Sequence, residues 1–243
     1  MKVMSFNVKH RIFEDITGLW KKRYIKIKEY ILKENPDILG LQELSKKGKK
    51  YLDKELEDYY IIGKKRHSII FTNEYNCILI KKKYEIVSHN TFSLSDKINV
   101  LGRKHKKDNF PRICVVGHIL AGEKKIMIVN THLDNSDTKN KKRLLKIYEK
   151  IVETQSDDEE YIILTGDYNM TLDNKNLNKF ASNYLIPFEN VTESTFPEYK
   201  DIRPIDHIFL DKRLKYKDVK VHTDSNQNGH LSDHYPISCE VEI

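Results

Sequence analysis

Short apolar runs bounded by polar and turn-forming residues dominate the hydrophobic pattern of the chain. Residues 3–8 and 37–43 read as strands, and each ends in polar residues. Apolar residues instead recur at helical spacing across residues 19–34 and about 138–155, which predicts two long amphipathic helices. The first helix should stop at Asn35-Pro36, because the residue before a proline avoids helical dihedral angles.

The rest of the pattern predicts further strands. Residues 113–120 and 125–131 flank the turn Ala121-Gly122-Glu123 and predict a β-hairpin. Polar or turn-forming boundaries between the short runs favour antiparallel neighbours. The other strands are expected at 60–62, 68–72, 77–80, 85–87, 161–165, 206–210, 219–222 and 238–243.

Many strands with two long helices between them indicate an α+β fold. They predict two packed, mainly antiparallel sheets whose outer faces are covered by helices. No repeat, low-complexity linker or shift in composition divides the chain, so residues 1–243 are interpreted as one domain. Trp20 and the aromatic residues of the helices are expected in the core.

Composition narrows the class of protein. No stretch is apolar for long enough to span a membrane, and the N-terminus lacks the pattern of a signal peptide. Cys77, Cys114 and Cys239 lie far apart in apolar runs, so buried free thiols in a reducing cytoplasm are expected. No feature indicates an obligate protein partner.

The chain carries a net charge of +7, which is compatible with a polyanionic partner. A/T-rich coding sequence produces the same abundance of Lys, Ile, Asn and Tyr, so the charge alone does not indicate nucleic acid. The basic run 103–107 could grip an anionic substrate, although a solvated loop is the simpler interpretation. The acidic run 157–160 is expected to be a solvated turn.

Polar residues cluster where the predicted strands end. The residue that follows the apolar run of a strand lies at the edge of the sheet. If several strands end at the same edge, their polar residues would meet in one cleft. A single Asp or Asn in such a place is usually a turn residue, but six such strand ends favour a site. Carboxylates and amides suit a hard cation such as Mg²⁺, and imidazoles suit acid–base work. The residues are Asn7, Gln42, Glu43, His132, Asp134, Asp167, Asn169, Asp206, His207, Asp233 and His234.

These segments resemble the motifs of the endonuclease/exonuclease/phosphatase superfamily, and they occur in the order found in that family across nearly the whole chain. The resemblance is greatest to compact bacterial metal-dependent hydrolases. It implies a DNase I-like four-layer αββα sandwich and cleavage of a phosphoester by an activated water. The motifs are Ser5-Phe6-Asn7-Val8, Leu41-Gln42-Glu43, Asn130-Thr131-His132-Leu133-Asp134, Gly166-Asp167-Tyr168-Asn169, Ile205-Asp206-His207-Ile208 and Ser232-Asp233-His234-Tyr235-Pro236.

The resemblance also implies roles for individual residues. Glu43 would be the principal ligand of Mg²⁺ or Mn²⁺, assisted by Asn7 and Asp233. Asp167 would orient or deprotonate the attacking water, and Asn169 would hold that water or the phosphate. His234, oriented by Asp206, would act as general base or steady the phosphate. His132 would stabilise the transition state or protonate the leaving oxygen. A negatively charged phosphodiester repels nucleophiles, so the cation and the imidazoles must absorb developing charge.

Three further residues are candidates for binding substrate. Asn76 and Arg112 resemble elements of the bacterial subgroup. Lys9 stands two positions after Asn7, where abasic-site endonucleases can carry an acidic residue, so an enzyme of that kind is disfavoured and contact of Lys9 with a substrate phosphate is expected. His207 is interpreted as a neighbour of the site.

The sequence therefore predicts a phosphoesterase acting on a phosphodiester or a phosphomonoester. A nuclease acting on DNA or RNA and a small-molecule phosphatase remain alternatives, because one fold hosts both. A non-catalytic binding scaffold is the alternative from another class. Degenerate family members usually lose a metal or histidine position, and this chain retains all of them.

Overall fold

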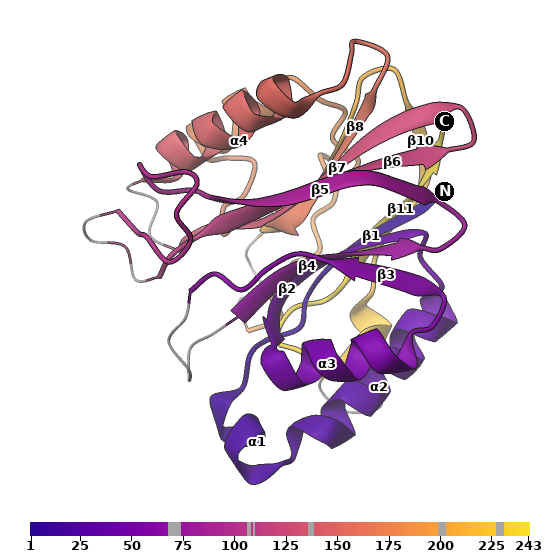
Figure 1. Ribbon diagram of the computed structural model, residues 1–243, viewed down its shortest axis with the longest axis vertical. Helices are drawn as coiled ribbons and strands as arrows, with labels where there is room; N and C mark the ends of the chain where they lie inside the picture. Colours follow the sequence, from indigo (N-terminus) through magenta and orange to yellow (C-terminus); the bar gives the residue numbers. More distant parts are fainter. Residues whose placement is uncertain (68–73, 106–107, 109, 136–138, 199–202, 227–230) are drawn as a thin grey trace.

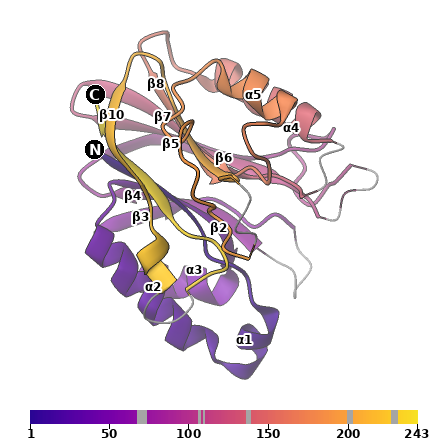
Figure 2. The ribbon, with the colours of Figure 1, turned by 180° about the vertical axis from the view of Figure 1, so that it is seen from behind.

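Two β-sheets pack face to face, and helices cover the outer face of each (Figure 1). The computed structural model describes residues 1–67, 74–105, 108, 110–135, 139–198, 203–226 and 231–243. The helices α2 (Trp20–Glu34) and α3 (Lys46–Glu55) lie on one side of the molecule, and α4 (Asn140–Thr154) and α5 (Lys175–Ala181) lie on the other (Figures 1 and 2). The expected αββα sandwich is confirmed.

The sheets contain six and five strands, in the orders β10-β11-β1-β2-β4-β3 and β5-β6-β7-β8-β9. The pairs β1–β2 and β7–β8 are parallel and their connections contain α2 and α4; the other pairs are antiparallel. The strands are β1 (Lys2–Asn7), β2 (Ile38–Ser45), β3 (Tyr59–Ile62), β4 (Glu74–Lys81), β5 (Glu85–Ser93), β6 (Ile113–Ala121), β7 (Lys124–His132), β8 (Tyr161–Asp167), β9 (Asp206–Leu210), β10 (Lys215–Val221) and β11 (Ile237–Glu242). The short elements α1 (Ile12–Thr17) and η2 (Thr223–Asn226) complete the described fold.

Alternate residues of each central strand enter different layers of the core. In β7, Ile126 and Ile128 face the other sheet, whereas Met127 and Val129 face the helices. The layer between the sheets is largely β-branched, since Val and Ile pack well on a pleated surface. Burial on both faces explains why these strands read as continuous apolar runs in the sequence. The predicted hairpin between β6 and β7 is confirmed.

Three helices, α1, α3 and α5, are not predicted by the sequence pattern. Helix α3 escapes the pattern because a lysine-rich segment with an internal glycine has few apolar positions. Gly48 is required there, because a Cβ atom would lie 2.1 Å from the ring of Tyr24. Ser45 caps the helix by accepting a hydrogen bond from the Gly48 amide at 3.0 Å. The expected strand at 68–72 lies outside the described residues.

Two expectations about exposure are wrong. Tyr148, a helix aromatic expected in the core, is 43% exposed, because it lies on the outer face of α4. Glu160 belongs to an acidic run expected to be solvated, yet it is buried and accepts a hydrogen bond from His118 Nδ1 at 2.8 Å. Within the described part of the basic run, His105 is buried and Lys104 donates to the carbonyl of Asp108.

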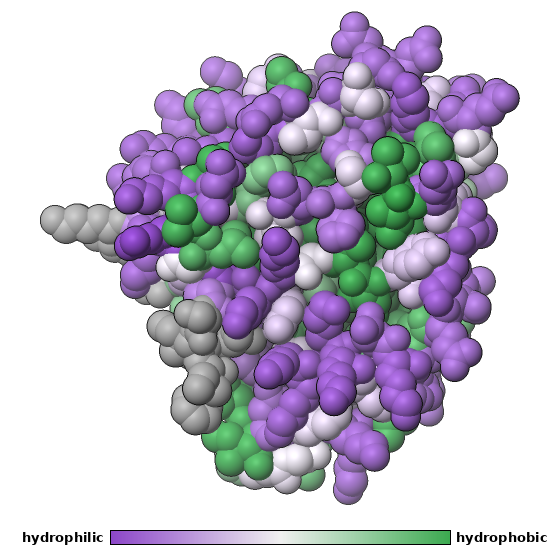
Figure 3. Space-filling view, viewed as in Figure 1, coloured by the Kyte–Doolittle hydropathy of each residue, from purple (hydrophilic) through white to green (hydrophobic). Residues whose placement is uncertain are grey.

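The face of the molecule shown in Figure 3 is mainly hydrophilic. Hydrophobic side chains gather at the lower edge of that view, where Figure 1 places α1. None of the residues of α1 is buried, and Phe13 and Ile16 are 70% and 68% exposed. Within the described residues, no helix is long and apolar enough to cross a membrane.

A buried amide joins the two sheets close to their polar rim. Asn130 on β7 donates two hydrogen bonds to the carbonyls of Leu41 and Cys77 in the opposite sheet, at 3.0 and 2.9 Å. Its Oδ1 accepts from Gln42 Nε2 at 2.7 Å and from Thr165 Oγ1 at 3.2 Å. The amide is fully buried, so each of these bonds replaces a contact with water that burial removes.

Asn130→Ala is expected to lower the free energy of unfolding by about 2–4 kcal/mol, because several buried polar partners lose their bonds at about 1 kcal/mol each or more. Denaturant titration measures this change. The exposed Asn99→Ala is the control and should change stability by less than about 0.5 kcal/mol. An unchanged midpoint for Asn130→Ala would show that the bridge between the sheets contributes nothing.

Candidate active site

The predicted strand ends converge on one pocket of about 360 Å³. The ends of β1, β2, β7 and β8 bring their polar residues to the side of the sandwich away from the chain termini (Figure 1). Polar residues at the ends of different strands are expected to converge on one cleft, and those that line this pocket do so. The lining residues are Lys9, His10, Glu43, Arg66, Glu74, Phe110, Arg112, His132, Asn135, Asp167, Asn169, Phe196, Asp233 and His234.

A buried carboxylate–imidazole pair stands at the floor of the pocket. His234 Nδ1 donates to Asp206 Oδ2 at 2.8 Å, and its Nε2 lies 3.7 Å from Asp167 Oδ2. Asp206 itself is 1% exposed and lies behind His234 rather than on the pocket surface. Burial disfavours the imidazolium, but the charges of Asp206 and Asp167 outweigh this effect and raise the pKa of His234 to about 10. His234 is therefore an imidazolium at neutral pH.

The second histidine of the pocket has the opposite protonation state. His132 Nε2 lies 3.5 Å from Asp167 Oδ2. Burial, followed by the charges of Arg112 and Arg66, holds the pKa of His132 well below its usual range. The two imidazoles beside Asp167 therefore differ, with His132 neutral and His234 charged. Paired titratable groups whose pKa values are pushed apart are typical of acid–base sites.

Asp167 lies between the two histidines at the end of β8. Its Oδ2 accepts a hydrogen bond from Asn7 Nδ2 at 3.0 Å, and its Oδ1 accepts from the Asn169 amide at 2.9 Å. Burial, and next the negative charge of Asp206, raise the pKa of Asp167 to about 7. A carboxylate with such a pKa can take a proton from water near neutral pH.

Glu43 reaches the pocket through a distorted stretch of strand. The pairing of β2 with β4 shifts register between Leu41 and Leu44, and Glu43 has a left-handed φ of 56°. Such a conformation costs about 1–3 kcal/mol for a non-glycine residue and is concentrated at functional sites. Glu43 Oε1 accepts from Asn7 Nδ2 at 3.1 Å, and Oε2 accepts from the His10 amide at 3.1 Å.

The donor set fits a hard divalent cation. Glu43, Asp233 and Asn7, the metal ligands implied by the sequence, all offer oxygen, which Mg²⁺ and Mn²⁺ prefer. Asn7 presents its Nδ2 to the carboxylates of Glu43 and Asp167, and its Oδ1 accepts a hydrogen bond from the Lys9 amide at 3.0 Å. A second group within the described residues, Asp167, Asp206 and His234, also has ligand atoms within 4.8 Å of one another.

The remaining sequence candidates are not all in the pocket. Lys9 lines it and pairs with Asp233, with Nζ 2.8 Å from Oδ2. Asn169 lines it with a φ of 50°, which asparagine tolerates, while its Nδ2 donates to the Leu133 carbonyl at 3.0 Å. Asn76 is not among the residues that line this pocket, but it borders the adjoining hollow with Arg66, Arg112 and His132, and its Nδ2 donates to the carbonyl of Ile113 at 3.3 Å. His207 is buried outside the pocket and donates to the Met170 carbonyl, as expected of a neighbour.

Sequence reasoning missed one wall of the pocket. His10 bridges Asp15 and Glu74, and Arg66 pairs with Glu74 and stacks on the ring of Phe110 at 4.3 Å. These residues come from separate loops and strands, and only the fold brings them together. The exception is His10, whose place just after the first strand is the same signal that identified Asn7.

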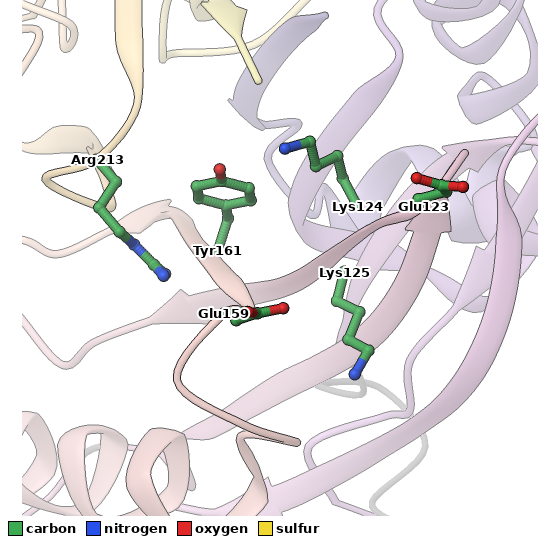
Figure 4. A pocket seen from close by; sticks show the side chains of 6 residues that line it. All are labelled: Glu123, Lys124, Lys125, Glu159, Tyr161 and Arg213. Atoms are coloured by element: carbon green, nitrogen blue, oxygen red, sulfur yellow. The ribbon is translucent and has the colours of Figure 1, made fainter.

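Another hollow, of about 410 Å³, lies at the opposite end of β7 and β8 (Figure 4). Its cations are engaged locally: Arg213 pairs with Asp211, and Lys125 pairs with Asp157. Lys124 and Arg213 lie over the ring of Tyr161 at 5.8 and 4.7 Å. None of the described residues that line this hollow is a histidine, whereas the pocket at the other end of the strands is lined by His10, His132 and His234.

Solved structures from several organisms share this architecture. An endonuclease/exonuclease/phosphatase family protein of Bacteroides thetaiotaomicron is 25% identical, with a TM-score of 0.87 over 99% of this chain and 94% of that one. A mannosyl-6-phosphatase of the same species is 24% identical, with a TM-score of 0.85 over 100% of both chains. D. rerio TDP2 complexed with single-strand DNA product is 15% identical, with a TM-score of 0.76 over 100% of this chain and 99% of that one. Identities this low show a shared fold.

Among curated proteins, no sequence matches the chain. A family model does match, and it spans residues 4–234. That range extends from the first strand to His234 and includes every strand end that contributes to the pocket. The chain belongs to the endonuclease/exonuclease/phosphatase family.

Proposed function

We propose that the protein hydrolyses a phosphoester with the help of a divalent cation, using a water activated by Asp167 and a leaving oxygen protonated by His234. The observation that carries this proposal is the Asp206–His234 pair, 2.8 Å apart and buried, with Asp167 at 3.7 Å on the other nitrogen of the imidazole. A carboxylate behind an imidazole fixes its tautomer and favours its charged form. Family membership and the pocket of oxygen donors support the same conclusion.

The roles of the residues follow from their positions and charges. Asp167 takes a proton from the attacking water as a new P–O bond forms. The ester P–O bond breaks on the opposite side, and the His234 imidazolium supplies the proton that the leaving oxygen needs. Neutral His132 donates a hydrogen bond to a non-bridging oxygen, and Asn169 holds the water or the phosphate. Asp167 then releases its proton to solvent and His234 takes one up, so that the starting state of both residues is restored.

The cation would be held by Glu43 and Asp233, with Asn7 as a further ligand, and it would supply positive charge against the phosphate oxygens. Lys9 sits beside Asp233 and is placed to contact the same phosphate. Mg²⁺ and Mn²⁺ are both compatible with these oxygen donors.

Hydrolysis of p-nitrophenyl phosphate or bis-p-nitrophenyl phosphate is expected to require Mg²⁺ or Mn²⁺ and to stop when EDTA is added. Glu43→Gln should raise the metal concentration needed for half-maximal rate by at least about 10-fold, because one carboxylate charge is lost. Isothermal titration of Mg²⁺ or Mn²⁺ measures the loss of binding directly. Glu123→Gln on the exposed hairpin is the control and should behave as wild type. Full activity in EDTA would refute the metal requirement.

The nuclease alternative is tested by adding single- and double-stranded nucleic acid to the substrate panel. The likeness to a TDP2 structure with a DNA product motivates these substrates, and the likeness to a mannosyl-6-phosphatase motivates a sugar phosphate. A nuclease should bind its substrate through many phosphates, so its affinity should fall steeply with salt. Inactivity on the whole panel with every metal would contradict the proposal and favour a non-catalytic scaffold.

A further inference from the structure

Two arginine side chains lie almost wholly buried on one wall of the active-site pocket. Arg66 and Arg112 are 6% and 7% exposed. Both line the pocket, and both also border a small hollow beside His132. Arg66 makes two contacts with Glu74, at 2.7 and 3.0 Å, and Arg112 Nε lies 3.3 Å from Asp134 Oδ2. Each guanidinium is therefore held in a fixed orientation by one carboxylate.

This arrangement is costly for a protein that binds nothing there. Burial lowers the pKa of Arg66, and the like charge of Arg112 lowers it further. Arg112 Nη1 is buried and has no hydrogen-bond partner within the described residues. A buried charged donor without a partner costs more than a neutral one. Because Arg112 also lines the pocket, its positive charge acts on an anion bound there.

Arg66 is also held by an aromatic ring. The guanidinium of Arg66 lies over the ring of Phe110 at 4.3 Å, and Phe110 is 38% exposed. Stacking on an aromatic ring and a two-point ion pair together fix the plane of the guanidinium. An arginine fork held in this way matches the oxygens of a phosphate group better than the point charge of a lysine does.

We propose that Arg66 and Arg112 form a subsite for a terminal phosphate group, so that the substrate is a phosphomonoester rather than an internal phosphodiester. This inference rests on the proposed function of the same pocket. A phosphomonoester carries nearly two negative charges and three terminal oxygens near neutral pH. A diester carries one charge and two such oxygens, which the cation and the two histidines can already satisfy.

The size of the pocket agrees with a small substrate. Its volume of about 360 Å³ lies near the lower end of the range of about 300–1,000 Å³ found for small-molecule sites. The ring of Phe196 packs against His234 with centroids 4.8 Å apart, and Phe110 stands on the wall with Arg66. Two aromatic rings thus border the space that the esterified group would occupy.

The test compares one monoester with one diester. Wild type, Arg112→Lys and Arg66→Lys are assayed on p-nitrophenyl phosphate and bis-p-nitrophenyl phosphate with the same metal. Each variant should lose about 10- to 100-fold in kcat/KM on the monoester, the range expected when a charged hydrogen bond is misplaced, and less than about 3-fold on the diester. Arg213→Lys, the same change in the hollow of Figure 4, is the matched control and should leave both rates unchanged.

Inorganic phosphate provides a readout that does not depend on turnover. Isothermal titration should show phosphate binding to the metal-loaded wild type and at least about 10-fold weaker binding to both variants. Equal losses on both substrates, or unchanged phosphate affinity, would overturn the subsite and assign the two arginines a structural role. If the wild type hydrolyses neither substrate but still binds phosphate through these arginines, the proposed function fails and the anion subsite stands.

Discussion

Replacing His234 with alanine is expected to lower kcat for phosphoester hydrolysis by about 10³-fold, because a positioned general acid or base contributes about 10²–10⁴-fold. His234 connects the buried Asp206 carboxylate to the pocket, since Asp206 does not line the pocket itself. The variant loses both the imidazolium charge and the proton donor. Steady-state kinetics on p-nitrophenyl phosphate at saturating metal measures the effect.

The control for this variant is His89→Ala, because His89 is exposed on β5 and remote from the pocket-forming strand ends. Asp206→Asn is the companion variant. It keeps the imidazole but removes the charge that favours its protonation, so the pKa of His234 should fall and the limb of the activity–pH profile that reports its deprotonation should shift to lower pH. A rate for His234→Ala within about 10-fold of wild type would remove this residue from the chemistry.

Asp167→Ala is expected to lower kcat by about 10²–10³-fold, because the base that accepts the proton of the attacking water is lost. Its carboxylate lies 3.5 Å from His132 and 3.7 Å from His234, so it is central to the arrangement of the pocket. Substrate binding should change less than turnover, since the cation and the positively charged wall remain. Separate determination of kcat and KM distinguishes the two effects.

The stability of Asp167→Ala provides a check that the fold survives. The variant loses the hydrogen bonds from Asn7 and from the Asn169 amide, but it also relieves the repulsion between two buried carboxylates. These effects oppose each other, so the Tm of the metal-free protein should change by no more than a few degrees. The exposed Asp53→Ala is the control for both measurements. A large fall in Tm with proportionate loss of folded protein would reassign Asp167 to a structural role.

Local patterns in the sequence predict much of the fold and the centre of the site. Strands such as β7 and β8 are buried on both faces and therefore read as apolar runs, and the polar residues at their ends mark His132 and Asp167 as candidates. The bounds of helix α2 are predicted to within a residue, because its periodicity and its proline boundary are local signals. The roles of the site residues rest on resemblance and on the geometry of the pocket, and the variants above test them.

Other features depend on contacts between residues far apart in the sequence. The helix α3 depends on Gly48 meeting Tyr24, which no local pattern reveals. Asn76 is expected at the substrate from the sequence, and the structure places it beside Arg66, Arg112 and His132 with its amide donating to Ile113 in the opposite sheet. The pair formed by Arg66 and Arg112 exists only because the ends of separate segments meet at one wall.

By itself, then, the sequence determined most of the strands, both long helices, and which polar residues stand at the ends of those strands. The packing of the two sheets decided which of these side chains meet. It placed Asp167 between His132 and His234, and it placed Asp206 behind His234. The physical reason is that the pKa values of His132, Asp167 and His234 depend on burial by segments that are distant in the sequence and on the charges that those segments contribute. Hydrophobic periodicity indicates which face of a strand is buried, but it does not indicate which segments of the chain pack against that face.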